Sequence, residues 1–384
     1  MVKPVRKSSS KNPPILSHEF IIQNHADIVS CVAMVFVIGI MIQATSPFAS
    51  IFIALQHNVT EFAAGEVPLY QPGMKDWCAV FFYSLICIVI HAILQEYVLD
   101  KISKRLHLSK SKLAVFSTSG QLAAFYLVST VWGLDIIVRE HYLPDLSLLW
   151  LDYPAALSFM LKLFMIVQLA YSLHELPEIY FQRTKREEYV NKAFKSIAAL
   201  VLIAVPYFLN FNRLLVCLIV LHYMSDLVYH VAQLVQTMDR EEKLSKNSIY
   251  FAVFSVCTLV SNVVLVLARL ASIIVSVLTL WYGLALENKE QIDLVQGNFN
   301  TAPVRLVLLG GVCALQAYLM FNFITQLLAK VRENKAAPVV VRGPKPKKDK
   351  SKKVVKKVEK EESDLPEVDQ NTNKNLRSRA QKTK

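Results

Sequence analysis

Glycine is scarce in this sequence, and no glycine-rich motif is present. The 384 residues include ten glycines, and none of the patterns G-x-x-x-x-G-K-[ST], G-x-G-x-x-G or G-x-S-x-G occurs. The metalloprotease pattern H-E-x-x-H is also missing. Nucleotide phosphates are cradled by backbone N–H groups of glycine-rich loops, so these absences argue against ATP-driven transport and against the common soluble enzyme classes.

The cysteines show neither metal-ligand spacing nor a disulfide framework. No CxxC pair and no Cys/His spacing is present, so we expect no metal site and no cofactor. All six cysteines lie in or beside apolar runs, whereas disulfide frameworks belong to small secreted domains with cysteines in polar loops. We interpret them as small apolar residues of helices. They are Cys31, Cys78, Cys87, Cys217, Cys257 and Cys313.

Long apolar runs dominate what is present. Hydrophobic residues make up 54% of the chain, and the mean hydropathy is +0.37. About 20 apolar residues span a bilayer as a helix, so the runs predict an all-α, polytopic membrane helix bundle of about eight transmembrane helices. The run at 249–282 is interpreted as one long or tilted helix. The expected spans are 28–46, 78–98, 120–138, 159–180, 193–209, 214–235, 249–282 and 304–328.

Basic residues in the connecting segments predict the orientation. Lys and Arg gather before the first span and after the second, fourth and sixth, while the alternate loops carry one or two each. By the positive-inside rule, this pattern places both termini in the cytosol. The sequon Asn58-Val59-Thr60 then falls in a loop outside the cytosol, where Asn58 can be glycosylated.

Composition sets apart the two terminal segments, and the division of the membrane part at residue 110 follows from the resemblance described below. Residues 1–27 form a cytosolic segment, 28–109 the first two spans with the sequon loop, and 110–330 a six-helix membrane domain. Residues 331–384 are a basic cytosolic tail, which we expect to be disordered because it has too few large apolar residues to form a core. Residues 330–384 hold 18 Lys and Arg against 8 Asp and Glu. The tail is expected either to contact anionic lipid or ribosomal RNA, or only to set topology.

Polar side chains inside the sixth and fourth spans are candidates for an intramembrane site. His222, Asp226 and His230 recur every four residues and share one helical face. They could line a polar cavity, do acid–base work, or form a hydrogen-bonded seam between helices. The fourth span carries a second row, and the second span ends in His91, Gln95 and Glu96; snorkelling to water is the alternative interpretation for these groups. The second row is Gln168, Tyr171, His174, Glu175 and Glu178.

The seventh span carries a buried cation. Ser255, Asn262, Arg269 and Ser276 are spaced by seven and form one stripe. A charge deep in hydrocarbon needs a partner, and we predict that Arg269 pairs with Asp226 or Glu175. In the third span, Asp135 and Arg139 are spaced i,i+4 and are expected to neutralise each other.

Several stretches closely resemble the translocating chain-associated membrane proteins, over about residues 12–330. That family implies an endoplasmic reticulum protein beside the Sec translocon, which contacts nascent signal sequences and membrane segments and assists their insertion. Ribosome contact through the basic tail and membrane lipid in the bundle are further expected partners. The stretches are PPILSHEFIIQNHADIVSCVAMV at 13–35, HAILQEYVLDKI at 91–102, SGQLAAFYL at 119–127, QLAYSLHELPEIYFQ at 168–182 and GNFN at 297–300.

The family also shares a lipid-sensing domain with the ceramide synthases, here about residues 110–330. Tyr207, His222 and Asp226 match later parts of the synthase motif, which raises a lipid-modifying enzyme as an alternative. The paired histidines of that motif should fall at Lys195 and Ser196, and neither is a histidine. The resemblance therefore implies a retained scaffold without acyl transfer. A lipid sensor or transporter is the third interpretation.

Overall fold

A computed structural model describes residues 17–60, 67–182, 186–238, 249–287 and 291–336. The first helices are α1 (His18–Gln23), α2 (His25–Met41), α3 (Ser46–Ile53), α4 (Asp76–Ile93), α5 (Asp100–Leu106) and α6 (Lys110–Arg139). The later ones are α7 (Phe159–Phe181), α8 (Arg186–Phe208), α9 (Asn212–Met238), α10 (Ile249–Ser276), α11 (Leu284–Leu286) and α12 (Ala302–Ala336). The two π-helical segments are η1 (Leu94–Leu99) and η3 (Val277–Gly283), and η2 (Leu146–Leu149) is a 3-10 helix.

The polytopic all-α prediction is confirmed. Within the described ranges, seven helical segments are long and apolar enough to cross a bilayer, and they coincide with the second to eighth predicted spans. The run at 249–282 is indeed one continuous span, since α10 passes through η3 into α11. The predicted tail of 331–384 begins too early, because residues 331–336 are the last residues of helix α12. The remainder, from residue 337 onwards, lies outside the described residues.

The first predicted span differs at its end. It was expected to reach residue 46, but α2 stops at Met41 after 17 residues, about 26 Å at 1.5 Å per residue. Thr45 ends the helix, because its hydroxyl donates to the carbonyls of Gly39 and Ile42. Pro47 then starts α3 in the first turn, where its missing N–H costs nothing.

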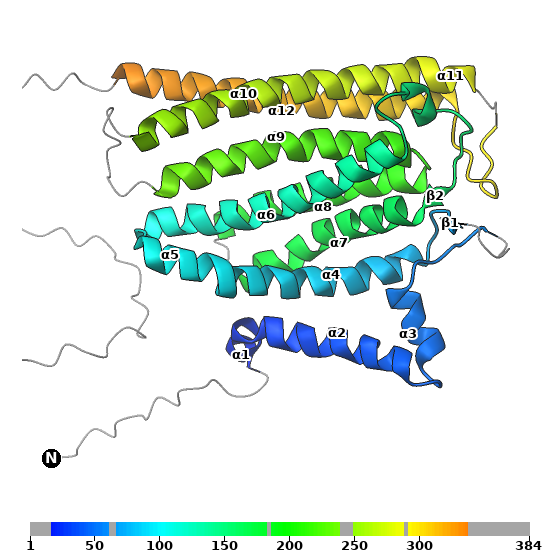
Figure 1. Ribbon diagram of the computed structural model, residues 1–384, viewed down its shortest axis with the longest axis horizontal. Helices are drawn as coiled ribbons and strands as arrows, with labels where there is room; N and C mark the ends of the chain where they lie inside the picture. The colour runs from blue at the N-terminus through cyan, green and yellow to red at the C-terminus, as the bar shows by residue number, and fades with distance from the viewer. Residues whose placement is uncertain (1–16, 61–66, 183–185, 239–248, 288–290, 337–384) are drawn as a thin grey trace, which may run out of the picture. The chain divides into compact units, whose positions relative to one another are not determined.

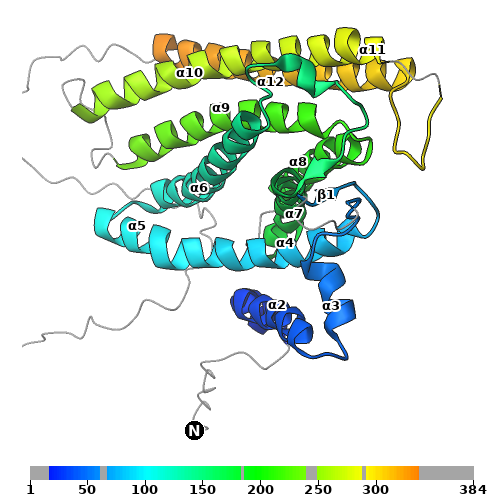
Figure 2. The same ribbon diagram turned by 45° about the vertical axis from the view of Figure 1, so that its right-hand side comes forward.

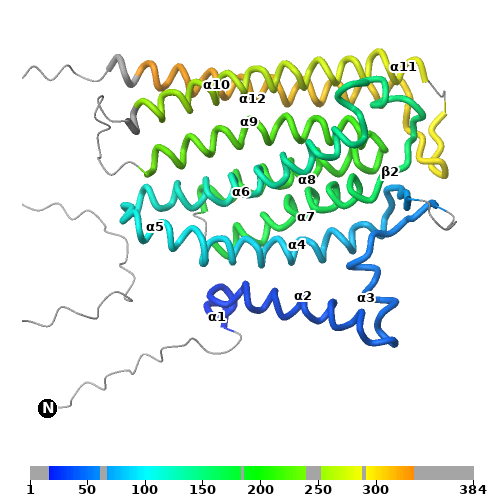
Figure 3. Tube along the Cα trace, viewed as in Figure 1, coloured from blue at the N-terminus to red at the C-terminus, as the bar shows by residue number. Residues whose placement is uncertain are grey.

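Successive spanning helices alternate in direction (Figures 1 and 3). We call the end where α5, α7 and α9 finish the basic end, because exposed Lys101, Lys104 and Arg105 lie there. The opposite end, where α7 and α9 begin, is the sequon end. There β1 (Leu69–Tyr70) pairs antiparallel with β2 (Leu157–Ser158), and a bridge joins Asn58 to Tyr70. Residues up to Lys330 form one compact unit, to which all contacts below belong.

Helix α9 lies between α6 and α10, while α7 packs against α4 and α8 (Figures 1 and 2). Gly133 of α6 allows the close approach of α9: a Cβ there would stand 2.3 Å from Cγ2 of Val220. Phe164, Met165 and Leu169 of α7 are fully buried in the main apolar cluster. This packing places the polar side chains of α4, α6, α7, α9 and α10 between helices.

Candidate functional site

The intramembrane polar residues form three groups rather than one cavity. We define them by their members, and each is described in turn. The Arg269 cluster is His222, Ser225, Asp226, Arg269 and Gln316. The Glu178 cluster is His25, His91, His174, Glu178 and Gln182. The Lys162 cluster is Asp76, Lys162 and Tyr207.

Arg269 is the centre of the first cluster and is only 3% exposed. Its guanidinium donates to Oγ of Ser225 at 2.6 Å and to Oε1 of Gln316 at 3.3 Å. Asp226 Oδ1 lies 3.5 Å from the same group, which confirms one of the two predicted partners. The pair joins α9 to α10, and Gln316 brings in α12. A buried cation that is paired and hydrogen-bonded avoids most of the cost of an isolated charge.

The imidazole of His222 is fixed by its neighbours. Nη1 of Arg269 lies 2.9 Å from Nδ1 of His222, and arginine can only donate, so Nδ1 accepts. The ring proton then sits on Nε2, which faces Oδ2 of Asp226 at 3.5 Å. Thus His222 links the cation to the carboxylate as a neutral ring. The side chains of His222 and Asp226 are still 37% and 28% exposed, so this cluster is accessible at mid-depth of α9.

Two predicted residues lie beside this cluster but outside it. His230, one turn after Asp226 along α9, has Nδ1 3.4 Å from Oγ of Ser119 on α6. Asn262 is half-buried on α10, two turns before Arg269. The predicted stripe of α10 is therefore a contact face toward α9 near Arg269, and Ser276 on the same stripe is fully buried.

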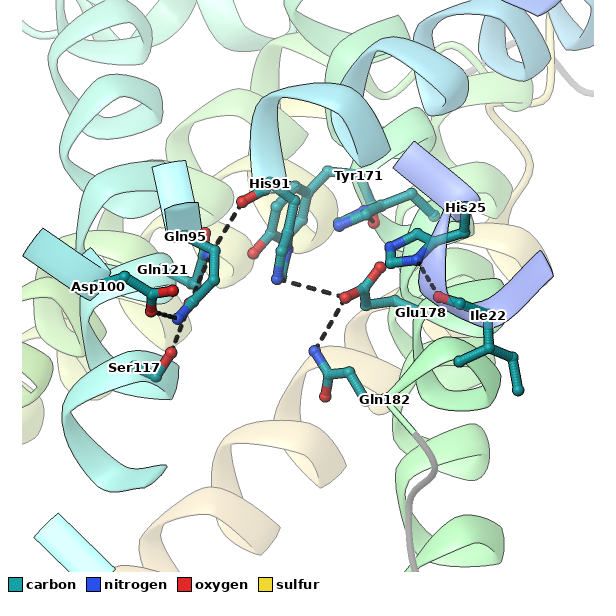
Figure 4. Close-up of polar contacts among 11 residues, drawn as sticks. Ile22, His25, His91, Gln95, Asp100, Ser117, Gln121, Tyr171, Glu178 and Gln182 are labelled. Atoms are coloured by element: carbon teal, nitrogen blue, oxygen red, sulfur yellow. Dashed lines mark hydrogen bonds and ion pairs between the residues drawn. The ribbon is translucent and has the colours of Figure 1, made fainter. Parts of the chain in front are cut away.

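The Glu178 cluster lies near the basic end, between α2, α4 and α7 (Figure 4). Oε1 of Glu178 accepts from Nε2 of Gln182 at 3.0 Å and stands 3.5 Å from Nε2 of His91. His174 is 1% exposed, and its Nδ1 is hydrogen-bonded to the carbonyl of Tyr171. From the sequence, His91, His174 and Glu178 were candidates for an intramembrane site, with snorkelling to water as the alternative interpretation. Glu178 is instead 9% exposed, because α2 covers this end of α7.

A chain of polar contacts continues from His91 to α6 (Figure 4). Nε2 of Gln121 donates to the carbonyl of His91 at 3.0 Å and to Oε1 of Gln95 at 3.2 Å. Gln95 in turn donates to Oδ1 of Asp100 at 2.7 Å. Gln95 lies in η1, and a π-helical turn inside a membrane helix re-aims side chains and often marks a functional site. The sequence pattern contained no feature that predicted this turn.

Glu175 and Gln168, also predicted, are held by single hydroxyl contacts. Oε2 of Glu175 accepts from Ser196 of α8 at 2.8 Å, so Glu175 is not the partner of Arg269. Gln168 is fully buried, and its Nε2 donates to Ser129 of α6 at 3.3 Å. These contacts tie α7 to its two neighbours.

Tyr207 lies apart from His222 and Asp226, in a cluster that sequence reasoning missed. Its hydroxyl donates to Oδ2 of Asp76 at 2.7 Å, and Oδ1 of Asp76 is 2.9 Å from Nζ of Lys162. Lys162 also donates to the carbonyls of Gln56 and Gln71, both at 2.7 Å. Three oxygens therefore surround the ammonium within 2.9 Å, and the cluster joins the sequon loop to α4, α7 and α8. Both charges sit at predicted span ends, where they resemble ordinary interfacial residues.

The sequon is presented at the surface of the sequon end. Asn58 and Val59 are exposed. The N–H of Thr60 donates to Oδ1 of Asn58 at 2.9 Å, and the Thr60 hydroxyl accepts from the N–H of Leu69 at 2.7 Å. The Asn58 amide nitrogen is thus on an ordered, exposed turn.

Comparison with known proteins identifies the family. The TLC domain model matches residues 115–325. The translocating chain-associated membrane protein 2 of Mus musculus is 41% identical over 84% of this chain and 85% of its own. The human protein of the same name is 42% identical over the same shares. The chain belongs to the translocating chain-associated membrane protein family and carries its TLC domain.

Proposed function

We propose that this protein sits beside the Sec translocon in the endoplasmic reticulum membrane, contacts nascent signal sequences and transmembrane segments, and assists their insertion or translocation. The observation that carries the proposal is the 41–42% identity over 84% of the chain to proteins named for association with translocating chains. Because these relatives are named for association with translocating chains, nascent polypeptides are the first partner to test.

The Arg269 cluster supplies a physical reason for such a role. Charged and polar side chains at mid-depth favour local water and a locally thinner bilayer. A marginally apolar segment leaving the translocon beside His222 and Asp226 would meet a less apolar surface than lipid tails. Strongly apolar segments partition into lipid without that help, so the effect is selective for weak signals.

Photocrosslinking tests the contact directly. Ribosome-bound chains with a short, weakly apolar signal and a photoreactive residue are targeted to membranes containing the protein. We expect a strong crosslink that fades once the chain is released. The variant His222→Ala/Asp226→Ala should weaken it, whereas Asp135→Asn/Arg139→Gln, which removes an exposed ion pair on α6, should not. No crosslink at any position, where the translocon itself crosslinks, contradicts the proposal.

The orientation belongs to the same proposal. The sequon end faces the lumen, and the basic end and both termini face the cytosol, as the positive-inside rule expects. Asn58 is then glycosylated in cells, and removal of glycans by an endoglycosidase should shift the wild-type protein on a gel but not Asn58→Gln. The tail, outside the described residues, would lie beside the ribosome, with ribosomal RNA as its contact.

We propose a non-enzymatic role over the alternative of a ceramide synthase-type reaction. Lys195 is exposed on α8, and Ser196 is buried and donates to Glu175, so neither position offers an imidazole for proton transfer. His222 has its Nδ1 occupied by Arg269. Purified protein should show no acyl-CoA-dependent activity; measurable turnover abolished by His222→Ala would favour the enzyme.

A further inference from the structure

Glu178 has an oxygen that lacks a hydrogen-bond donor. The residue is 9% exposed over all its atoms and 12% over its side chain, and its Oε2 has no partner among the residues that the structure describes. Its other oxygen already receives Gln182 and faces His91. Leaving a buried carboxylate oxygen without a hydrogen-bond donor is costly, so the arrangement calls for a donor that the described residues do not supply.

Two of the imidazoles in the cluster, those of His25 and His174, keep Nε2 as an acceptor. Nδ1 of His25 lies 2.8 Å from the carbonyl oxygen of Ile22, and Nδ1 of His174 is bonded to the carbonyl of Tyr171. A carbonyl only accepts, so in both rings Nδ1 carries the proton and Nε2 of the neutral ring has a lone pair. The His25 ring stacks on the ring of Phe181, three residues after Glu178 on α7, with 4.5 Å between the ring centroids. The cluster is thus rich in acceptors and negative in charge, and it fits a cation with several N–H donors.

We propose that the Glu178 cluster binds the primary ammonium of an aminophospholipid headgroup, such as phosphatidylethanolamine. A primary ammonium carries one positive charge and three N–H donors, and one of these donors matches Oε2 of Glu178. A quaternary ammonium has the charge but no N–H and cannot satisfy the same atoms. The site therefore distinguishes ethanolamine from choline headgroups by hydrogen bonding, not by charge.

The position of the cluster favours a lipid headgroup as the source. Glu178 lies one turn from Phe181, where α7 ends, and His25 begins α2 at the same end of the bundle. These are the depths at which headgroups meet the helix ends. Exposed cations near this end, such as Lys104 and Arg105, suit the lipid phosphate. The proposed orientation determines only which leaflet of the membrane supplies the lipid; the lipid contact itself does not depend on it.

Lipid binding to the purified full-length protein tests this proposal without a translocon or nascent chain. Native mass spectrometry would measure retention of phosphatidylethanolamine and of phosphatidylcholine with the same acyl chains. We expect phosphatidylethanolamine to be held about tenfold more tightly, equivalent to about 1.4 kcal/mol, since only this headgroup can donate a charge-assisted hydrogen bond to the buried oxygen. Glu178→Gln should remove the preference. Glu175→Gln, one turn away with its carboxylate already bonded to Ser196, should retain it.

Three outcomes overturn the proposal. These are equal retention of both lipids by the wild type, an unchanged preference in Glu178→Gln, or loss of the preference in Glu175→Gln as well. If Glu178→Gln instead weakens crosslinks to lysine-containing signals while the lipid preference is absent, the ammonium comes from the nascent chain and the lipid assignment is wrong. A wild-type preference together with absent nascent-chain crosslinks would retain this site and remove the proposed function. Thermal midpoints of both variants, measured in the same detergent, confirm that they fold.

Discussion

Lys162 and Asp76 form an ion pair of 2.9 Å in which neither side chain is more than 1% exposed. The pair joins α7 to the start of α4, and the Tyr207 hydroxyl and the Gly73 N–H complete the shell of Asp76. When one of two paired buried charges is removed, the folded state is destabilised, because the remaining charge has neither a partner nor water around it.

Removing one member of this pair should destabilise the protein strongly. Asp76→Ala or Lys162→Met is expected to cost about 3–5 kcal/mol, because each leaves an unpaired buried charge. The double variant should cost much less than the two losses added together. Tyr207→Phe removes one neutral donor and should cost about 1–2 kcal/mol. The thermal midpoint of unfolding in detergent measures the stability of each variant. If the destabilisations of the two single variants simply add in the double variant, the ion pair is contradicted.

The Arg269–Asp226 contact should show coupling of the same kind. Arg269→Ala leaves Asp226 and His222 without their donor, so it is expected to destabilise more than Arg269→Ala/Asp226→Ala. A double-mutant cycle should give an interaction of about 0.5–3 kcal/mol. The exposed Arg139–Asp135 pair is the control within the same chain, and its cycle should give a clearly smaller interaction, because water screens both charges. Equal interaction energies for the two pairs would show that burial of Arg269 does not strengthen its interaction with Asp226.

His57 should make the sequon loop sensitive to acid. Partial burial lowers the pKa of His57 below its usual 6.5, and nearby Lys162 and Lys75 add to this, while Asp76 opposes it. The unfolded chain therefore takes up a proton at a higher pH than the folded chain does. His57 then contributes stability that is complete above pH 6.5 and is lost as the pH falls through the lowered pKa.

The measurement is the thermal midpoint at a series of pH values from 7.5 to about 5. His57→Asn should flatten the fall below pH 6.5, since asparagine tolerates the left-handed backbone (φ 60°) at this position. His141→Asn, a histidine with the same φ on an exposed loop, should leave the wild-type profile unchanged. An identical pH profile in His57→Asn and the wild type would contradict the assignment.

The sequence predicted the spans well because hydrocarbon thickness and backbone hydrogen bonding leave few choices for an apolar run. It also named Asp226 as one of two partners for Arg269, since a charge in the middle of such a run must be paired. The sequence could not show that Tyr207 donates to Asp76, because these residues are 131 positions apart. Their contact depends on how α8 packs near the start of α4. The burial of Glu178 was missed because it depends on α2 covering the end of α7.

The measurement that most directly tests the central claim is insertion in reconstituted proteoliposomes. Vesicles containing the Sec translocon, with or without this protein, would receive ribosome-bound chains with weak or strong signals. We predict that the protein raises insertion of weak signals and leaves strong ones unchanged, and that His222→Ala/Asp226→Ala loses this effect. Equal insertion of weak signals with and without the protein would contradict the account.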